Sequence, residues 1–356
     1  MKATDVVRSW GRILTGYPTA LSIEVTKECP LSCPGCYAFQ PEHLGGLSLT
    51  SVTDFKGDDL VERVVALVDE KRPLVVYFVG GEPLVRFREL SAIFPRLEER
   101  KIHARVVTSA VRPIPPEWSR SKFVGVVVSI DGLPPEHDLR RKPATYDRIL
   151  KHIEGHQIVV HCTVTSQMMK RDSYLEEFVD FWSGRPEVRG IEVSFFTPQV
   201  GETAEEILTA EMRRKAVATL AALAPRYRKL VLNPYILDAY LNPPRNPSEC
   251  IFASVTECFS PDLETVVTPC QFGGNPNCGE CGCLGSIALH AVGERRLPIG
   301  VKLGTLFKGS QRVGRWARDF REGREGREGR EGREGRERKR TPATLPVYQP
   351  TPQSDR

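Results

Sequence analysis

The sequence contains no apolar run long enough to cross a membrane and no secretory leader pattern. A membrane-spanning helix needs about 20 consecutive apolar residues, and no stretch of this chain reaches that length. A leader begins with basic residues, followed by an apolar segment and a small-residue cleavage site, and the first residues lack this order. We therefore expect a cytoplasmic protein without a membrane span.

Most of the chain also lacks net charge. The formal net charge is +5, and residues 309–340 account for it with twelve Lys and Arg against seven Asp and Glu. A metal-binding adaptor that contacts nucleic acid would carry basic and aromatic residues between its cysteines. Residues 245–285 offer only Arg245 as a base. We therefore disfavour the adaptor class and do not expect nucleic acid as a partner.

Cysteine, in contrast, is abundant and grouped. The chain has ten cysteines: Cys29, Cys33 and Cys36, six more between residues 250 and 283, and a lone Cys162. Disulfide frameworks are typical of small secreted proteins, so in a reducing compartment the two groups indicate metal ligands. Cys162 lies in an apolar strand pattern, and we expect it to be a small buried hydrophobic residue.

Alternating strand and helix patterns predict an α/β fold. The expected strands are Leu21–Thr26, Leu74–Val79, Ala104–Thr108, Val124–Ile130, Ile158–Thr165 and Gly190–Phe196. The expected helices are Asp59–Lys71, Phe87–Arg100, Tyr146–His156, Ser173–Ser183 and Glu211–Leu223. Strands that alternate with crossover helices form a parallel sheet. The pattern alone leaves open whether this sheet is a barrel or an open sheet.

The C-terminal third has a different composition. From Asn242 onward Pro, Cys and Gly replace the periodic patterns, and Arg321–Gly335 consists of five copies of Arg-Glu-Gly. A repeat with no apolar residue cannot offset the entropy of ordering the chain, which predicts disorder. We therefore divide the chain into a lead-in (1–19), a core (20–241), a Cys-rich module (242–305) and a disordered tail (306–356).

The first cysteine group follows the first expected strand with the spacing C-x3-C-x2-C. An iron–sulfur cluster is normally held by four thiolates, so Cys29, Cys33 and Cys36 would leave one iron open, and open metal positions are where chemistry occurs. The loop resembles the signature of the radical S-adenosylmethionine (radical SAM) superfamily. This resemblance implies a 4Fe-4S cluster whose fourth iron is chelated by SAM. It also implies a partial (β/α)6 barrel with its site at the C-terminal ends of the strands.

A second motif follows the second expected strand. Gly80, Gly81, Glu82 and Pro83 are similar to the GGE motif of the superfamily, which implies that they contact the amino group of SAM. Glycines let a ligand approach the backbone, and a carboxylate accepts hydrogen bonds from an ammonium group. The family usually has an aromatic residue before the third cysteine, where this chain has Gly35. We expect Tyr37 to take over that contact with the adenine.

A third segment, Val126–Gly132, resembles the fourth-strand segment of the radical SAM peptide maturases. The resemblance implies that Ser129 and Asp131 meet the ribose or carboxylate of SAM, with Arg141 nearby. The strand ends Thr163–Thr165 and Ser194–Phe196 would line the same mouth. The sequence identifies no residue that acts directly in catalysis.

The Cys-rich module is similar to the SPASM or Twitch extensions, in which cysteines around a hairpin hold auxiliary clusters. A hairpin with a Pro-Asp turn is expected between Cys258 and Cys270. The resemblance implies a second 4Fe-4S cluster on Cys258, Cys270, Cys278 and Cys281, with Cys250 and Cys283 as alternates. A structural zinc site would use the same ligands and stays a rival. The Asn275–Cys283 end is also weakly similar to the tail of adenosylhopene synthase.

The implied chemistry is the reductive cleavage of SAM to a 5′-deoxyadenosyl radical. That radical would abstract hydrogen from a peptide or small-molecule substrate, and adenosyl transfer to an apolar, isoprenoid-like acceptor remains an alternative. The reduction potential of the glutathione pool is about −250 mV, and that of low-potential ferredoxins is about −400 mV. We therefore expect a flavodoxin- or ferredoxin-type protein as electron donor.

Overall fold

A parallel sheet runs through the part of the chain that this computed structural model describes, residues 3–47, 49–298 and 300–334. Its strands are β1 Ala20–Glu24, β2 Val75–Val79, β3 His103–Thr108, β4 Val124–Ser129, β5 Ile158–Val164, β6 Val188–Phe195 and β7 Thr256–Phe259. Their order is β6-β5-β4-β3-β2-β1-β7, and every neighbouring pair is parallel. The first six are the strands that the sequence predicted.

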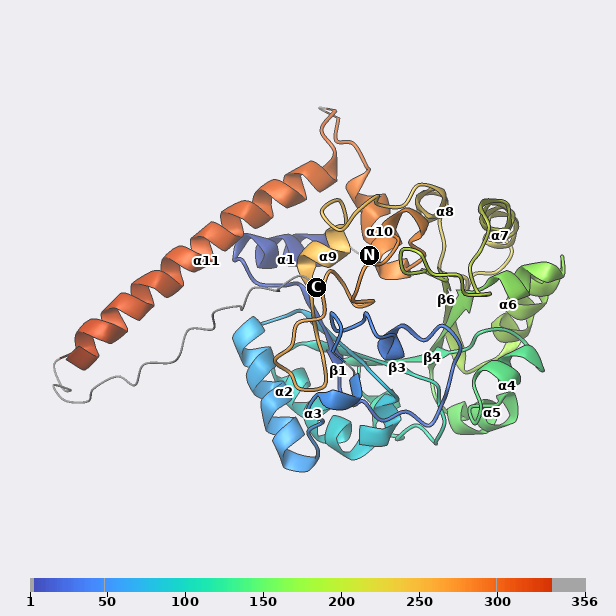
Figure 1. Cartoon of the computed structure of the whole chain (residues 1–356), viewed down its shortest axis with the longest axis horizontal. Helices are drawn as coiled ribbons and strands as arrows, with labels where there is room; N and C mark the ends of the chain where they lie inside the picture. The colour runs from blue at the N-terminus through green and yellow to red at the C-terminus, as the bar shows by residue number, and fades with distance from the viewer. Residues whose placement is uncertain (1–2, 48, 299, 335–356) are drawn as a thin grey trace, which may run out of the picture.

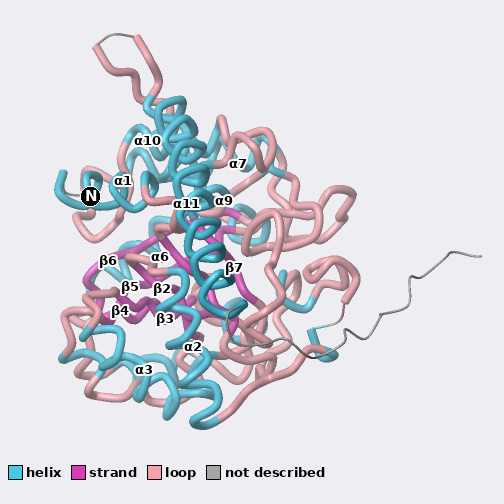
Figure 2. Tube along the Cα trace, turned by 90° about the vertical axis from the view of Figure 1, so that its left-hand side faces the viewer, coloured by secondary structure: helices cyan, strands magenta, loops and turns pink. Residues whose placement is uncertain are grey.

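Helices pack around this sheet (Figures 1 and 2). The α-helices are α1 Ala3–Leu14, α2 Gly57–Lys71, α3 Phe87–Glu99, α4 Glu136–Arg140, α5 Tyr146–Ile153, α6 Tyr174–Gly184, α7 Ala210–Leu223, α8 Pro234–Leu241, α9 Ile251–Val255, α10 Leu284–Gly293 and α11 Leu303–Glu334. Leu60 of α2, Leu90 of α3 and Ile23 of β1 are fully buried in one hydrophobic core. No helix among the described residues is long and apolar enough to cross a membrane.

The sheet is strongly curved. Arg105 lies on β3 and Glu192 on β6, so two strands separate them, a span of roughly 14 Å in a flat sheet. Nevertheless, Arg105 Nη2 lies 2.8 and 3.0 Å from the two carboxylate oxygens of Glu192. The strands therefore curl around a polar interior. The sheet does not close between β6 and β7, which confirms the expected partial barrel.

The sheet has one strand more than the sequence predicted. β7 pairs in parallel with β1, with Cys258 opposite Ser22, and it is also the first arm of the expected hairpin. The hairpin is short: Ser260 N donates to Thr265 O at 2.9 Å, Val267 N donates to Cys258 O at 2.8 Å, and Phe259 and Val266 form an antiparallel bridge. An uncovered β1 edge would leave backbone groups unpaired, which gives the extra strand its physical reason.

The Cys-rich module also reaches the opposite edge of the sheet. Phe195 N at the end of β6 donates to Gly282 O at 2.9 Å. Leu284 N, at the start of α10, donates to Ser194 Oγ at 3.1 Å. The module is thus hydrogen-bonded to β1 on one side and to β6 on the other, and it spans the open side of the partial barrel.

Residues 306–334, which the sequence predicted to be disordered, belong to helix α11 instead. The start of α11 packs on the body of the protein: Phe307 stacks on Trp10 with ring centroids 4.5 Å apart, and Gln311 Nε2 donates to Ser254 O at 2.7 Å. Once a helix has started, each added residue gains one hydrogen bond, and Arg and Glu are good helix formers. The packed start therefore explains the helix in the repeat. Residues 335–356 of the expected tail lie outside the described residues.

We predict that two truncations of α11 differ in their effect on stability. Truncation after Lys308 removes the Gln311 contact and the hydrogen bond from Arg318 to Gly16 O, so the melting temperature should fall by about 3–6 °C. Truncation after Arg321 removes only the repeat and the residues beyond it, and should leave the melting temperature unchanged. Thermal unfolding of both variants and the full chain makes the comparison. Identical curves for all three would show that α11 does not stabilise the fold.

Candidate functional site

The C-x3-C-x2-C loop leaves the carboxyl end of β1 and is held there by the motif that follows β2. Gly81 N donates to Thr26 O at 2.8 Å, and Glu82 N donates to Glu28 O at 2.9 Å. A Cβ at Gly81 would collide with Glu28 O, so only glycine allows the two loops to approach this closely. The two motifs that the sequence singled out are therefore one structural unit.

A buried ion network supports the base of this loop. The Arg86 side chain is 5% exposed, and its Nη2 lies 3.0 Å from Asp54 Oδ2 and 3.0 Å from Glu28 Oε1. Thr26 Oγ1 donates to the same Asp54 oxygen at 3.0 Å. Arg86 thus joins Glu28, which precedes the cysteine loop, to Asp54, which follows it. No sequence motif indicated this role.

The three thiols of the loop suit an iron–sulfur cluster. Cys29, Cys33 and Cys36 are free and only partly exposed. Burial raises the pKa of Cys29 to about 12 and also raises the pKa of Cys33 and Cys36, against the lowering influence of Arg141 on those two. Without a metal the thiols are therefore protonated at neutral pH, whereas a bound metal keeps its thiol ligands deprotonated. As the side chains stand, no three Cys, His, Asp or Glu residues in the described ranges are grouped closely enough for a single metal ion.

Glu82 is buried, with 2% of its surface exposed. Its Oε1 accepts from Leu84 N at 2.9 Å and from Thr108 Oγ1, and its Oε2 accepts from Ser109 N at 2.8 Å and from Ser109 Oγ. The carboxylate therefore joins the end of β2 to the end of β3. Pro83 begins the short 3-10 helix Pro83–Arg86 that Glu82 caps.

Asp131 and two arginines form a second charged group that faces the cysteines. Arg140 Nε and Arg141 Nε lie 3.1 and 2.8 Å from Asp131 Oδ2, and Thr163 N donates to Oδ1 at 3.2 Å. Burial would raise the pKa of Asp131, but the two guanidiniums hold it far below its ordinary value. Ser129 ends β4, two residues before Asp131, and is buried. The group thus supplies fixed positive charge beside Cys33 and Cys36.

The space beside Gly35, just before the third cysteine, is filled by an aromatic side chain that follows β6. A Cβ at Gly35 would lie 2.8 Å from the ring of Phe196, and Gly35 has a φ of +64°. Phe196 therefore occupies the space beside Gly35. Tyr37 points elsewhere: its ring packs on His43 and Phe272, with centroids 5.6 and 5.2 Å away. It joins the loop to the Cys-rich module.

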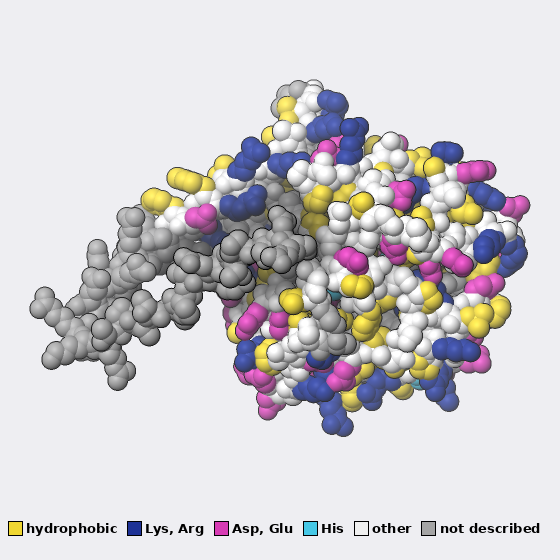
Figure 3. Space-filling view, in the orientation of Figure 1, with side chains coloured by type: hydrophobic (Ala, Val, Ile, Leu, Met, Phe, Trp, Pro, Cys, Tyr) yellow, Lys and Arg dark blue, Asp and Glu magenta, His cyan; other side chains and the backbone are white. Residues whose placement is uncertain are grey.

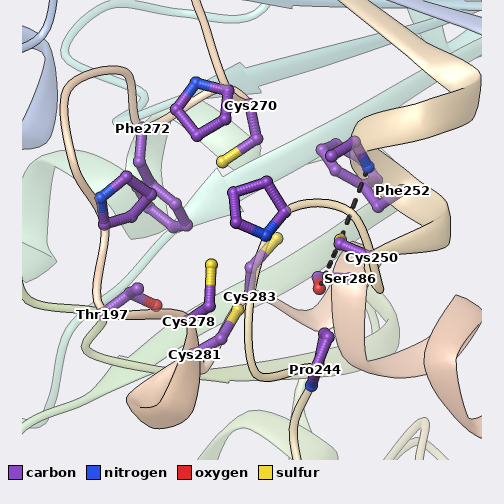
Figure 4. A pocket seen from close by; sticks show the side chains of 14 residues that line it. Thr197, Pro244, Cys250, Phe252, Cys270, Phe272, Cys278, Cys281, Cys283 and Ser286 are labelled. Carbon is purple, nitrogen blue, oxygen red and sulfur yellow. Dashed lines mark hydrogen bonds between the residues drawn. The ribbon is translucent and has the colours of Figure 1, made fainter.

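Five of the six cysteines of that module line one pocket (Figure 4). They are Cys250, Cys270, Cys278, Cys281 and Cys283. Cys258 is not among them, because it lies on β7 and packs in a separate apolar cluster with Val267 and Ala38. The pocket thus contains three of the four cysteines that the sequence grouped, and Cys258 lies outside its lining although it is near enough to Cys270 to raise the pKa of that thiol.

The environment of this pocket keeps its thiols protonated and its loop in place. Burial raises the pKa of Cys278 to about 11, and burial also raises the pKa of Cys270 and Cys281. Arg213 of α7 is buried and donates from Nη1 to Cys281 O at 3.1 Å and from Nη2 to Glu280 O at 2.5 Å. Arg213 therefore fixes the loop that carries Cys278 and Cys281.

The family of the chain follows from comparison with known proteins. Residues 23–181 match the profile of the radical SAM superfamily. The chain therefore contains a radical SAM domain over these residues. Members of the superfamily use a 4Fe-4S cluster and SAM, and the match covers the Cys29 loop, the Gly80–Pro83 motif and Asp131. The C-x3-C-x2-C spacing and the three free, partly exposed thiols fit the ligand set of such a cluster.

More specific similarities cover less of the relatives. PqqA peptide cyclase of Granulibacter bethesdensis is 32% identical over 97 residues, which are 26% of this chain and 23% of the cyclase. A PqqA peptide cyclase of Rhodopseudomonas palustris is 32% identical over 96 residues, 27% of this chain and 23% of that protein. The chain therefore aligns with only about a quarter of these relatives.

Two solved structures share the fold at low sequence identity. SuiB of Streptococcus suis bound to the precursor peptide SuiA has a TM-score of 0.53 and 18% identity, over 79% of this chain and 67% of SuiB. AnSMEcpe with bound AdoMet has a TM-score of 0.54 and 14% identity, over 85% of this chain and 98% of that chain. The similarity extends well beyond residues 23–181 and supports the fold of the whole described body.

We predict that Glu82→Gln reduces stability. Both oxygens of Glu82 now accept hydrogen bonds. In the variant an NH2 group replaces one of these oxygens and faces an N–H or O–H donor, so one buried hydrogen bond is lost and two donors oppose each other. The expected loss is about 1–3 kcal/mol in the free energy of unfolding. Urea unfolding without SAM measures it, with the exposed Glu264→Gln as control. An unchanged unfolding free energy would mean that the carboxylate does not join β2 to β3.

Proposed function

We propose that this protein is a radical SAM enzyme that acts on a peptide. The observation that carries the proposal is the joined unit of the Cys29–Cys36 loop and the Gly80–Pro83 motif, with Asp131 and Arg141 beside it. When bound, a 4Fe-4S cluster and SAM supply reductive cleavage of a C–S bond and a 5′-deoxyadenosyl radical that abstracts hydrogen. The protein residues hold, orient and shield that chemistry.

Each group in the site has a role in this proposal. Cys29, Cys33 and Cys36 are the cluster ligands. The backbone carbonyl groups of Gly80 and Gly81 accept from the amino group of SAM, and Glu82 holds that turn in place through its hydrogen bonds to the end of β3. Ser129, at the end of β4, faces the ribose. These assignments rest on the proximity of the motifs at the carboxyl ends of β1, β2 and β4.

Arg141 and Asp131 act as a charged pair in the same site. Asp131 engages both arginines through one oxygen, so Arg141 retains donors for the carboxylate of SAM. Its positive charge also favours thiolate over thiol at Cys33 and Cys36. Phe196, next to Gly35, offers an apolar face for the adenine.

The choice of a peptide substrate rests on the relatives. PqqA peptide cyclase and SuiB with its bound precursor peptide are peptide-directed by name. The open side of the partial barrel is covered by the Cys-rich module, which would exclude water from a radical. The electron donor in this proposal is a flavodoxin- or ferredoxin-type protein. A reducing, cytoplasmic setting agrees with ten free cysteines.

We further propose that the pocket of the Cys-rich module holds a second 4Fe-4S cluster. Five thiols line it, one more than the four that such a cluster needs. Cys250, Cys270, Cys278 and Cys281 are the ligands in this proposal, and Cys250 takes the place of Cys258. Cys281 and Cys250 raise the pKa of both Cys270 and Cys278, so these four thiols lie near one another. Cys283 lines the same pocket and is also close to Cys270, which makes it the alternate ligand.

We predict that replacing Cys29, Cys33 and Cys36 together by Ala removes one cluster and leaves the other. After anaerobic reconstitution the variant should lose about four irons per chain and all SAM cleavage, because each missing thiolate removes an iron ligand. Iron analysis and detection of 5′-deoxyadenosine provide the two readouts. Unchanged iron content with unchanged cleavage would exclude the proposed function.

The second cluster is tested by a matched pair of variants. Cys270→Ser with Cys278→Ser should cost about four irons per chain, because two of four ligands are lost. Cys258→Ser should keep the iron content of the unaltered chain, because Cys258 lies outside the pocket. If the Cys29/Cys33/Cys36 variant contains one zinc per chain and no iron, the second site is a structural zinc site. If Cys258→Ser loses iron, Cys258 is a cluster ligand in the unaltered chain.

A further inference from the structure

Helix α11 presents a second apolar face that points away from the body. Leu306, Val313, Trp316 and Phe320 are 36%, 57%, 69% and 55% exposed. Their spacings of seven, three and four residues place them on one side of a helix, and the rings of Trp316 and Phe320 stack with centroids 5.8 Å apart. We call these four residues the α11 stripe. Figure 3 shows apolar and basic side chains together along this projecting helix.

The α11 stripe is not the face that attaches the helix to the protein. Phe307 packs on Trp10, Gln311 is buried and donates to Ser254 O, and Arg318 Nη1 donates to Gly16 O. These contacts come from the other side of the helix. The core of the fold therefore does not account for the aromatic residues of the stripe.

The charges around the stripe are almost all positive. Arg312 and Arg315 are exposed, and as direct sequence neighbours of Val313 and Trp316 they lie about 100° around the helix from those residues, on its polar side. Between Leu303 and Arg321 the only acidic residue is Asp319. A helix with one apolar aromatic face and arginines on its polar side is typical of segments that lie in the interface of an anionic membrane.

We infer that the α11 stripe docks on an anionic phospholipid surface. Trp and Phe enter the boundary between headgroups and acyl chains, and Arg312 and Arg315 contact the lipid phosphates. A second copy of the chain fits less well, because the Leu303–Arg321 part of the helix carries five basic residues and one acidic residue, so two paired stripes would bring like charges together. The inference concerns attachment to one face of a membrane and is independent of the proposed function.

The chain contains its own reporter for this docking. Of its four tryptophans, Trp118 and Trp182 are at most 1% exposed, and Trp10 is stacked on Phe307 and donates to Ser310 Oγ. Trp316 is therefore the one whose fluorescence responds to a change of solvent. It should shift to shorter wavelength when vesicles are added.

Full-length protein is mixed with vesicles of phosphatidylglycerol or of phosphatidylcholine and sedimented. We expect binding to phosphatidylglycerol only, weakened by salt, together with the blue shift. Trp316→Ser with Phe320→Ser should abolish binding, and Arg312→Gln with Arg315→Gln should weaken it about 30-fold, at roughly fivefold per arginine. The control Leu139→Ser changes an equally exposed residue on α4, 70% exposed, and should bind normally.

Truncation after Arg321 separates the stripe from the basic segment Arg336–Arg340, and it should retain binding. Loss of binding in that variant would assign the affinity to the basic segment and overturn the inference. No binding to either vesicle, or equal binding to both, would also overturn it. So would a concentration-dependent dimer, seen by light scattering, that disappears in the Trp316/Phe320 variant. Each variant changes exposed residues, and an unaltered melting temperature verifies its fold.

Discussion

The arrangement of this protein depends on how the two edges of its six-stranded core are satisfied. A curved parallel sheet that does not close leaves β1 and β6 with unpaired backbone groups. The Cys-rich module supplies partners for both, through β7 on one side and through Gly282 on the other. The same hydrogen bonds that complete the sheet therefore fix the position of the five-cysteine pocket relative to the Cys29 loop.

Buried charged residues hold together the loops at the carboxyl ends of the strands. Arg86, Glu82 and Asp131 are almost completely buried, and each is engaged by groups from a different loop. Breaking one partner of such a group leaves an uncompensated charge, which costs far more than an exposed pair would. The loops at the ends of β1, β2, β3 and β4 are therefore mutually dependent. A site built this way is rigid before any ligand arrives, which reduces the entropy lost on binding.

The sequence predicted the repeating part of this structure and missed what depends on distant contacts. Continuous apolar runs located β1 to β6, and the cysteine and glycine motifs located the site, because both signals are local. β7 is four residues long, and its pairing with β1 cannot be seen in its own pattern. Phe196 reaches Gly35 only because the sheet curls. Cys258 has the spacing of a ligand but lies on β7, outside the lining of the five-cysteine pocket. The Arg-Glu-Gly repeat is helical because it continues a helix whose first part packs on the body of the protein. The composition of the repeat alone does not reveal that preceding segment.

The pairing of β1 with β7 also constrains how the chain matures during synthesis. Thr19 Oγ1 donates to Val255 O across 236 residues of sequence. At about 5–20 residues per second a ribosome needs roughly 10–50 s to make the intervening chain. Once residue 83 has been made, the nascent protein has its first cysteine group and the motif that clamps it, but not the module that covers them. The loop and its clamp are therefore built from residues made early, whereas the segment that covers them and completes the sheet is made more than 150 residues later.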